Sequence, residues 1–118
     1  MEKTQIVKLT YNYSLRIICL YQELIKNQEY ILSKQLLRSA TSIGANVFEA
    51  GAAISKRDFA HKMSIASKEA RETYYWLKLL KDSNLIGIDL TGYIEDVKSI
   101  INVLTAIVKT TQRRIRQK

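Results

Sequence analysis

The segment Gln35–Gly51, QLLRSATSIGANVFEAG, decides the fold because it carries two adjacent stripes at helical spacing. The apolar stripe recurs at alternating steps of four and three residues and comprises Leu36, Ala40, Ile43, Val47 and Ala50. The polar stripe, one residue behind, comprises Gln35, Ser39, Ser42, Asn46 and Glu49. Consecutive helical residues are about 100° apart, so the stripes form neighbouring faces of one helix. Small residues fill its middle and allow close packing, which predicts a central helix.

Length and composition fit one domain spanning residues 1–118. A chain of 118 residues can bury a core without disulfides or metals, and it has no proline to interrupt helices. The single cysteine, Cys19, excludes an internal disulfide and fits a reducing cytoplasm. We recognise no signal peptide and no run of about 18 apolar residues, so we expect a cytoplasmic protein that does not span a membrane.

Apolar periodicity predicts four helices at about residues 4–26, 34–53, 56–81 and 91–114. Ser33 and Ser55 are the expected N-caps of the second and third helices, and Asp58 suits the start of the third. Gly51 stands where glycine commonly closes a helix. Cys19, within the first helix, is expected to act as a small apolar filler.

Four amphipathic helices joined by short loops predict an all-α protein, an antiparallel up-and-down four-helix bundle. The fourth helix carries two neighbouring apolar lines: Ile94, Val97, Ile101, Leu104, Val108 and Thr111, and beside them Ile100, Val103 and Ile107. This face is wider than the core of a four-helix bundle requires. It therefore predicts a homo-oligomer, although the pattern does not define the number of subunits.

The formal net charge of +8 indicates an anionic partner, of which nucleic acid is the commonest. Residues 109–118 contain five basic residues and no acid, and residues 56–81 contain seven basic residues against three acids. A basic helix end is often simply solvated, which is the alternative interpretation of the tail. The excess along the third helix favours a binding role.

Residues that could carry out catalysis are scarce. The one histidine, His61, is expected to face solvent, and no His, Cys, Asp or Glu set has the spacing of metal ligands. No glycine-rich loop matches a nucleotide-binding motif, so we expect no cofactor. Glu69 and Glu72 could form a catalytic carboxylate pair, but salt bridges to neighbouring basic residues are the favoured interpretation. We therefore predict a protein that is not an enzyme.

The polar stripe of the second helix has two interpretations. Arg38, Ser42 and Glu49 lie within about 40° around the helix axis, with Asn46 adjacent. If this face is buried, each group needs a hydrogen-bond partner. The favoured interpretation is a structural polar network, with Glu69 of the third helix as a further member. The other is a ligand or nucleic-acid site lined by Arg38 and Asn46.

Residues 38–80, RSATSIGANVFEAGAAISKRDFAHKMSIASKEARETYYWLKLL, resemble the signature of bacterial four-helix-bundle proteins encoded in intervening sequences of large-subunit (23S) ribosomal RNA genes. The matching positions are Arg38, Ser39, Ala40, Ser42, Ile43, Asn46, Glu49, Ala50, Arg57, Asp58, Phe59, Ile65, Ala66, Glu69, Trp76 and Leu77. Ala50 departs from the pattern, since glycine frequently follows the glutamate. The motif covers the second and third helices, and the outer helices match in pattern only.

The resemblance implies a homopentamer arranged around a central axis. The accessory variability protein of diversity-generating retroelements is similar in architecture and binds a reverse transcriptase and nucleic acid. It lacks the R-S-A-x-S-I block, so its function transfers only by analogy of fold. Location in a ribosomal RNA gene is suggestive of RNA association.

These observations favour a basic, oligomeric bundle that binds RNA or a ribonucleoprotein through phosphate contacts. The expected nucleic-acid-binding residues are Lys56, Arg57, Lys62, Arg113, Arg114, Arg116 and Lys118. The alternative function is a protein-interaction scaffold that docks a partner protein, such as a nucleic-acid enzyme, on the same basic surface.

Overall fold

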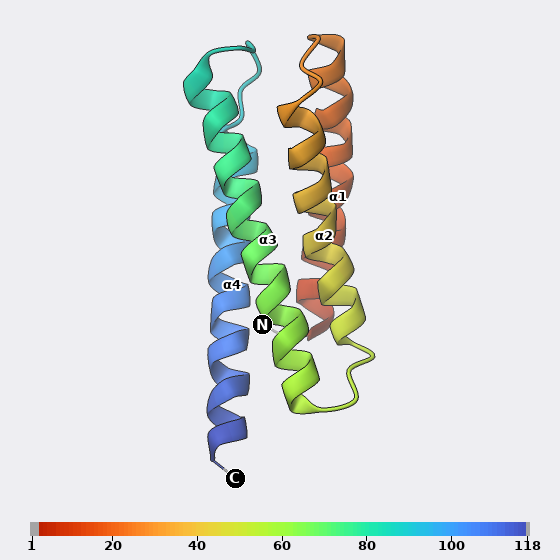
Figure 1. The fold of residues 1–118 in the computed structure, drawn as a ribbon, viewed down its shortest axis with the longest axis vertical. Helices are drawn as coiled ribbons and strands as arrows, with labels where there is room; N and C mark the ends of the chain where they lie inside the picture. Colours follow the sequence, from red (N-terminus) through yellow and green to blue (C-terminus); the bar gives the residue numbers. More distant parts are fainter. Residues whose placement is uncertain (1–2, 118) are drawn as a thin grey trace.

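The computed structural model describes residues 3–117, and the predicted all-α fold with four helices is confirmed. The helices are α1 (Lys3–Lys26), α2 (Leu32–Ala50), α3 (Lys56–Ser83) and α4 (Thr91–Arg116), and no strand occurs among the described residues. Figure 1 shows α1 and α3 running toward one end of the molecule and α2 and α4 running back. The molecule is a rod with principal extents of 52 × 22 × 21 Å.

The core consists of the apolar stripes expected from the sequence. All five apolar positions of the α2 stripe are buried. In α3, seven residues at steps of three and four are also buried: Phe59, Met63, Ala66, Ala70, Thr73, Leu77 and Leu80. The same spacing in α1 places Ile6, Tyr13, Ile17, Leu20 and Leu24 in the core, while Leu9 is half-buried. Apolar burial along these faces is the main source of stability.

Helices that are neighbours in sequence pack side by side, and small residues at their contacts hold them close together. A Cβ atom added to Gly44 of α2 would lie 3.2 Å from Ser14 Oγ and 3.3 Å from the Thr10 carbonyl oxygen of α1. On the α3 side, the hydroxyls of Ser39 and Thr73 form a buried hydrogen bond of 2.9 Å. Bulkier side chains at either position would push the helices apart.

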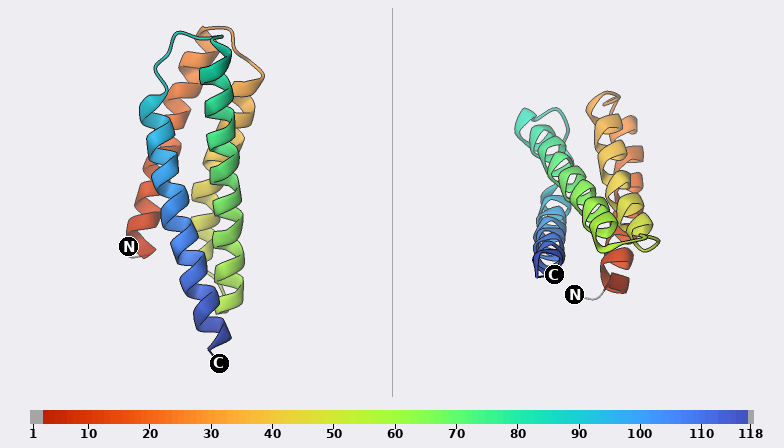
Figure 2. Two further views of the ribbon diagram at one scale, coloured as in Figure 1. Left: turned by 90° about the vertical axis from the view of Figure 1, so that its left-hand side faces the viewer. Right: turned by 60° about the horizontal axis from the view of Figure 1, so that its bottom comes forward.

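The contact between α1 and α4 is short and lies near the start of α4. The Tyr13 hydroxyl donates to the Tyr93 carbonyl oxygen over 2.8 Å, and burial raises the pKa of Tyr13 well above its usual range. Arg16 forms an ion pair with Asp96, and its guanidinium carbon lies 4.9 Å from the centre of the Tyr93 ring. Beyond this region, α4 extends past the N-terminal end of α1 (Figures 1 and 2).

The short α1 contact changes what α4 buries. Only Val97, Ile100 and Leu104 are buried among the described residues of α4. The core takes members of both expected lines, since Ile100 belongs to the second line and Val97 and Leu104 to the first, whereas Ile101 and Val108 of the first line are half-buried. The C-terminal half of α4 packs against α3 and lacks cover from α1, so its apolar residues remain partly accessible.

Helix α2 begins and ends earlier than predicted, at Leu32 and Ala50. Ser33 is not its N-cap but lies buried within the first turn, where its hydroxyl donates to the Glu29 carbonyl oxygen. The Glu29 carboxylate instead accepts bonds from the backbone N–H groups of Leu32 and Ser33, at 2.9 and 2.6 Å. A carboxylate two residues before the N-cap position thus satisfies the free N–H groups that a serine cap would otherwise bind.

Two further expectations concern single residues. Ser55 is confirmed as the N-cap of α3, since its Oγ accepts the Asp58 N–H over 3.0 Å. Cys19 was expected to fill space in the core, but it is exposed on α1. It falls outside the buried stripe, which the residues on either side, Ile17 and Leu20, already fill.

Candidate nucleic-acid interface

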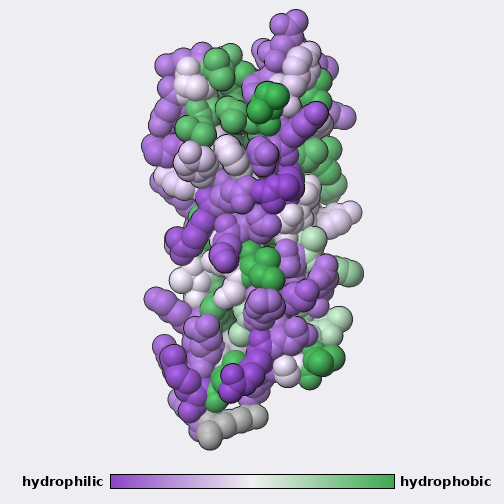
Figure 3. All heavy atoms as spheres, viewed as in Figure 1, coloured by the Kyte–Doolittle hydropathy of each residue, from purple (hydrophilic) through white to green (hydrophobic). Residues whose placement is uncertain are grey.

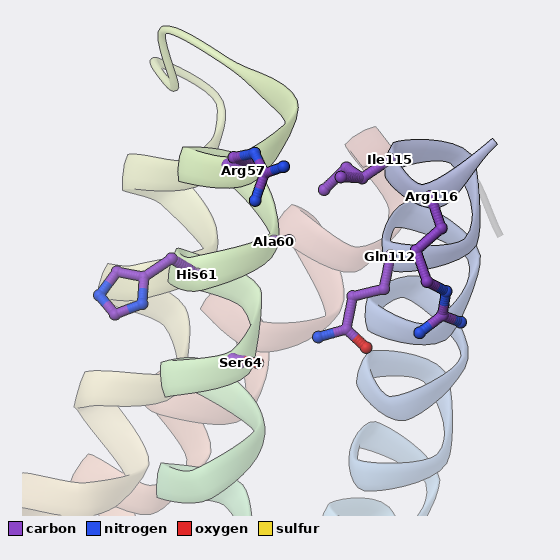
Figure 4. A pocket seen from close by; sticks show the side chains of 7 residues that line it. All are labelled: Arg57, Ala60, His61, Ser64, Gln112, Ile115 and Arg116. Carbon is purple, nitrogen blue, oxygen red and sulfur yellow. The ribbon is translucent and has the colours of Figure 1, made fainter. Parts of the chain in front are cut away.

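The first turns of α3 and the last turns of α4 lie side by side at one end of the rod (Figures 1 and 2). A hollow of about 440 Å³ lies between them. It is lined by Arg57, Ala60, His61, Ser64, Gln112, Ile115 and Arg116. In Figure 4, Arg57 and Gln112 extend into the space between the helices, while His61 points to the opposite side of α3. The arginines thus dominate the charge of this hollow.

Two adjoining hollows continue the same surface, since each shares lining residues with its neighbour. They have volumes of about 350 and 380 Å³. The first is lined by Ala50, Gly51, Ala53, Ile54, Ser55, Lys56, Phe59, Thr111 and Arg114, and the second by Ser55, Lys56, Arg57 and Ile115. No acidic residue lines any of the three hollows.

Four of the seven expected nucleic-acid-binding residues therefore line one continuous surface: Lys56 and Arg57 from α3, and Arg114 and Arg116 from α4. We call these four residues the basic end. The nearest acid in sequence, Asp58, is engaged at the helix start, where its Oδ2 accepts the Ile54 N–H over 3.2 Å. Four positive charges converge with no nearby carboxylate lining the same space, so an anion would find little competition there.

The other three expected residues do not line these hollows. Lys62 faces α2 and forms an ion pair of 2.9 Å with Glu49, whose hydrogen bond raises the pKa of Lys62. Arg113 is exposed on α4. Lys118 lies outside the described residues. The tail is helical through Arg116, so its neighbouring arginines Arg113 and Arg114 project about 100° apart around α4.

The polar stripe of α2 is divided into separate contacts. Arg38 forms ion pairs with both Glu69, at 3.5 Å, and Glu72 of α3. The Trp76 indole N–H also donates to Glu72 over 2.9 Å, and this hydrogen bond, together with Arg38, lowers the pKa of Glu72. Both Glu69 and Glu72 thus form the salt bridges that the sequence analysis favoured for them.

The remaining members of the stripe bond within α2 or to Lys62. Ser42 Oγ donates to the Arg38 carbonyl oxygen at 2.7 Å, and Asn46 Nδ2 donates to the Ser42 carbonyl oxygen at 2.8 Å. Neither side chain is buried. Because this face is partly open to water, it does not require the connected network that full burial would demand.

Within residues 3–117, no group of three or more His, Cys, Asp or Glu side chains is placed to hold a metal ion. No helix of this described part combines the length and apolarity needed to cross a membrane. The residues around the basic end offer positive charge, hydroxyls and amides, which suit binding of phosphate groups.

The sequence profile of the family described as 23S rRNA-intervening sequence protein matches residues 2–106. The chain belongs to this family. A solved structure from Bacteroides thetaiotaomicron VPI-5482, described as a protein with unknown function from the S23 ribosomal protein family, is 40% identical to it. The match covers 92% of this chain and 99% of the other, with a TM-score of 0.87. No curated protein matches the chain.

Membership of the 23S rRNA-intervening sequence protein family confirms the resemblance inferred from residues 38–80. The lining residues Ser64 and Gln112 were not anticipated from the sequence. Their spacing from the arginines could have identified them, because Ser64 follows Arg57 by seven residues and Gln112 precedes Arg116 by four. Both intervals return a helix to the same face.

Proposed function

We propose that this member of the 23S rRNA-intervening sequence protein family is a non-enzymatic, antiparallel helical bundle that self-associates and binds RNA, alone or in a ribonucleoprotein, through phosphate contacts. The proposal rests on the basic end. There, two cations from the start of α3 and two from the end of α4 line connected hollows, and no acidic residue belongs to the lining. The single, exposed Cys19 fits a reducing compartment, so we propose a cytoplasmic location.

Phosphate is the anion best suited to this arrangement. Arginine side chains present several N–H groups in one plane and can bind a phosphate through two of them. The N-terminus of α3 adds the positive end of a helix dipole beside Lys56 and Arg57. The family description itself refers to 23S ribosomal RNA, which supports RNA as the source of the phosphates.

Self-association is supported by an exposed apolar face on α1 and α2, on the opposite pair of helices from the basic end. Tyr11, Leu15 and Ile18 step by four and three along α1, and their exposed fractions are 64%, 47% and 40%. Phe48 of α2, 74% exposed, follows Gly44 by one turn on the side that meets α1. We propose that a second copy covers this face, and family resemblance favours a pentamer.

Light scattering tests the oligomer with Leu15→Asp and Phe48→Asp. We expect several subunits for the natural protein and dissociation for both variants, because each places a charge in an apolar interface. A monomeric natural protein would refute the oligomer and remove the gain in affinity that several linked sites provide.

RNA binding is tested with Arg57→Gln/Arg116→Gln and a charge-matched control, Lys8→Gln/Lys34→Gln. The control lysines are exposed on α1 and α2. Both variants remove two positive charges, so a nonspecific effect of net charge would be equal in both. We expect at least a tenfold loss of RNA affinity for the arginine variant and less than a twofold loss for the control. Equal losses would refute a localised site.

A protein-interaction scaffold is the second candidate. Ile54, which lines one hollow of the basic end, is 94% exposed, and a protein partner with an acidic rim could cover it. Pull-down with and without ribonuclease separates the two functions. Co-purification of RNA that nuclease removes supports the first, and a protein partner retained after nuclease supports the second.

A further inference from the structure

We infer that the RNA is single-stranded, and that its backbone continues from the basic end along the outer groove between α3 and α4, with one base stacked on Tyr75. This inference rests on the proposed RNA-binding function and specifies its substrate. Figure 2 (left) looks onto the surface concerned, where α3 and α4 lie side by side in front of the other two helices.

The groove is bordered by one line of residues on each helix. On α3 the line has strict seven-residue spacing: Arg57, Ser64, Arg71 and Lys78. On α4 the line is Lys98, Thr105, Lys109, Gln112 and Arg116, with steps of seven, four, three and four. Such steps keep each line on one face of its helix, so basic and polar side chains follow the whole groove.

Contacts at two levels show that the two lines face each other, and a third contact joins the α4 line to another residue of α3. At the basic end, Arg57 and Ser64 share a hollow with Gln112 and Arg116. Farther along, Arg71 Nη2 donates to Thr105 Oγ1 over 3.3 Å. Near the start of α4, Lys98 Nζ lies 5.4 Å from the centre of the Tyr74 ring.

The acids of α3 and α4 are mostly engaged elsewhere. Glu69 and Glu72 pair with Arg38 of α2, and Asp96 pairs with Arg16 of α1. Asp58 bonds to the Ile54 N–H. Within the groove, Asp82 pairs with Lys78 at 3.5 Å and neutralises it.

Six exposed cations that border the groove have no ion pair among the described residues. Five belong to the two lines: Arg57, Arg71, Lys98, Lys109 and Arg116. The sixth, Lys68, follows Arg57 by eleven residues, about three helical turns, and so lies on the same face of α3. Glu95 is the remaining acid of the two helices and is exposed on α4. Figure 3, which has the view of Figure 1, shows hydrophilic and hydrophobic residues intermixed on the front of the molecule. The groove is therefore strongly positive along its length, as expected for a surface that follows a phosphate backbone.

The length of the groove fits a short single-stranded segment. Arg57 and Tyr75 are 18 residues apart on α3, which corresponds to roughly 27 Å at the helical rise. Single-stranded sites in proteins extend over a few to about 16 nucleotides. The six cations can thus contact several successive phosphates in one subunit.

Tyr75 favours a single strand over a duplex. Its side chain is 55% exposed. The rings of Tyr75 and Trp76 pack edge-to-face, with 5.2 Å between their centres and an interplanar angle of 70°. Trp76 is itself held by its hydrogen bond to Glu72. The ring is therefore both accessible and supported, and it lies four residues beyond Arg71 on the groove side. Bases inside a duplex are stacked on both faces, whereas an unpaired base can be splayed out and stack on an aromatic ring.

The test uses two probes, an oligouridylate of about 12 nucleotides and a blunt RNA duplex of equal length. The groove variant is Lys68→Gln/Lys109→Gln, because neither lysine forms a hydrogen bond or an ion pair with another described residue and folding should be retained. Its charge-matched control is Lys8→Gln/Lys34→Gln. The stacking variants are Tyr75→Ala and Tyr75→Phe, and their control is Tyr30→Ala, which removes an exposed tyrosine from the connection before α2.

We expect Lys68→Gln/Lys109→Gln to weaken oligouridylate binding at least fivefold. The slope of log affinity against log salt should become shallower by about 1.4, because two phosphate contacts to a single strand are lost and each contributes about 0.7. Tyr75→Ala should lower oligouridylate affinity fivefold or more and leave duplex affinity unchanged. Tyr75→Phe keeps the aromatic ring and should therefore retain the oligouridylate affinity of the natural protein. The two controls should stay within twofold of the natural protein.

The failures of the two proposals are distinguishable. If Arg57→Gln/Arg116→Gln abolishes binding while the groove and Tyr75 variants bind normally, the groove inference is overturned and the proposed RNA-binding function stands. Equal affinity for duplex and oligouridylate, with Tyr75→Ala unchanged, also overturns the single-strand inference. Absence of binding to either probe by the natural protein refutes the proposed function itself.

Discussion

Substitution of Gly44 tests the close contact between α1 and α2. In an exposed helix interior, glycine to alanine stabilises by about 1 kcal/mol, because alanine has the higher helix propensity. Here the new Cβ would lie 3.2 Å from Ser14 Oγ and 3.3 Å from the Thr10 carbonyl oxygen. Both distances are shorter than an ordinary carbon–oxygen contact, and the carbonyl belongs to the backbone of α1.

The two effects can be weighed against each other. Overpacking of this kind costs about 1–3 kcal/mol, so at a midpoint cost of about 2 kcal/mol the helix propensity offsets roughly half. We therefore expect Gly44→Ala to reduce the free energy of unfolding by about 1 kcal/mol, measured by urea denaturation. Ser14→Ala removes the nearer contact, so the double variant Ser14→Ala/Gly44→Ala should recover part of the loss in a double-mutant cycle.

An increase in stability of about 1 kcal/mol for Gly44→Ala would contradict this account. It would mean that α1 and α2 separate without cost and that the small residues of α2 have no packing role. Ala45→Gly, at the neighbouring exposed position, provides the reference for helix propensity alone.

Three further predictions concern stability. Glu72 has a lowered pKa because it accepts hydrogen bonds from Trp76 and Arg38. Its stabilising contribution is therefore present above its ordinary pKa of 4.5 and is lost as pH falls through the lower pKa of the folded state. The unfolding free energies of Glu72→Gln and the natural protein should differ at neutral pH and converge in acid. Ser55→Ala removes the N-cap of α3 and should lower the unfolding free energy by about 1 kcal/mol, whereas no change would show that water replaces the cap. Leu104→Ala, in the buried part of α4, should cost about 2–5 kcal/mol, and Val108→Ala, at a half-buried position, should cost clearly less; equal losses would contradict the short α1–α4 contact.

Much of the fold could be predicted from the sequence because local periodicity determines it. The three-four steps of α2 and α3 select the buried face of each helix, and Ser55 caps α3 through its immediate neighbours. The start of α2 was missed because Glu29 acts as the cap from outside the usual position. The sequence shows two apolar lines on α4, and which of their members are buried depends on where α1 ends, which is a tertiary property.

The candidate site was only partly predictable. Its cations were identified as a set, but sequence gives no measure of which cations pair with acids on another helix. Lys62 was expected to contact nucleic acid and instead pairs with Glu49 across the α2–α3 contact. Conversely, Lys68 and Lys109 are 41 positions apart in the sequence. They become candidate RNA contacts only in the folded chain, where α3 and α4 lie side by side and both lysines border one groove.

The central claim is that this chain binds RNA through phosphate contacts, and the salt dependence of binding by the natural protein tests it most directly. Affinity for a fluorescent oligouridylate should be measured between about 50 and 200 mM salt. If the four cations of the basic end each contact a phosphate, the slope of log affinity against log salt is about −2.8 per subunit. No detectable binding, or an affinity unchanged across this range, would contradict the account.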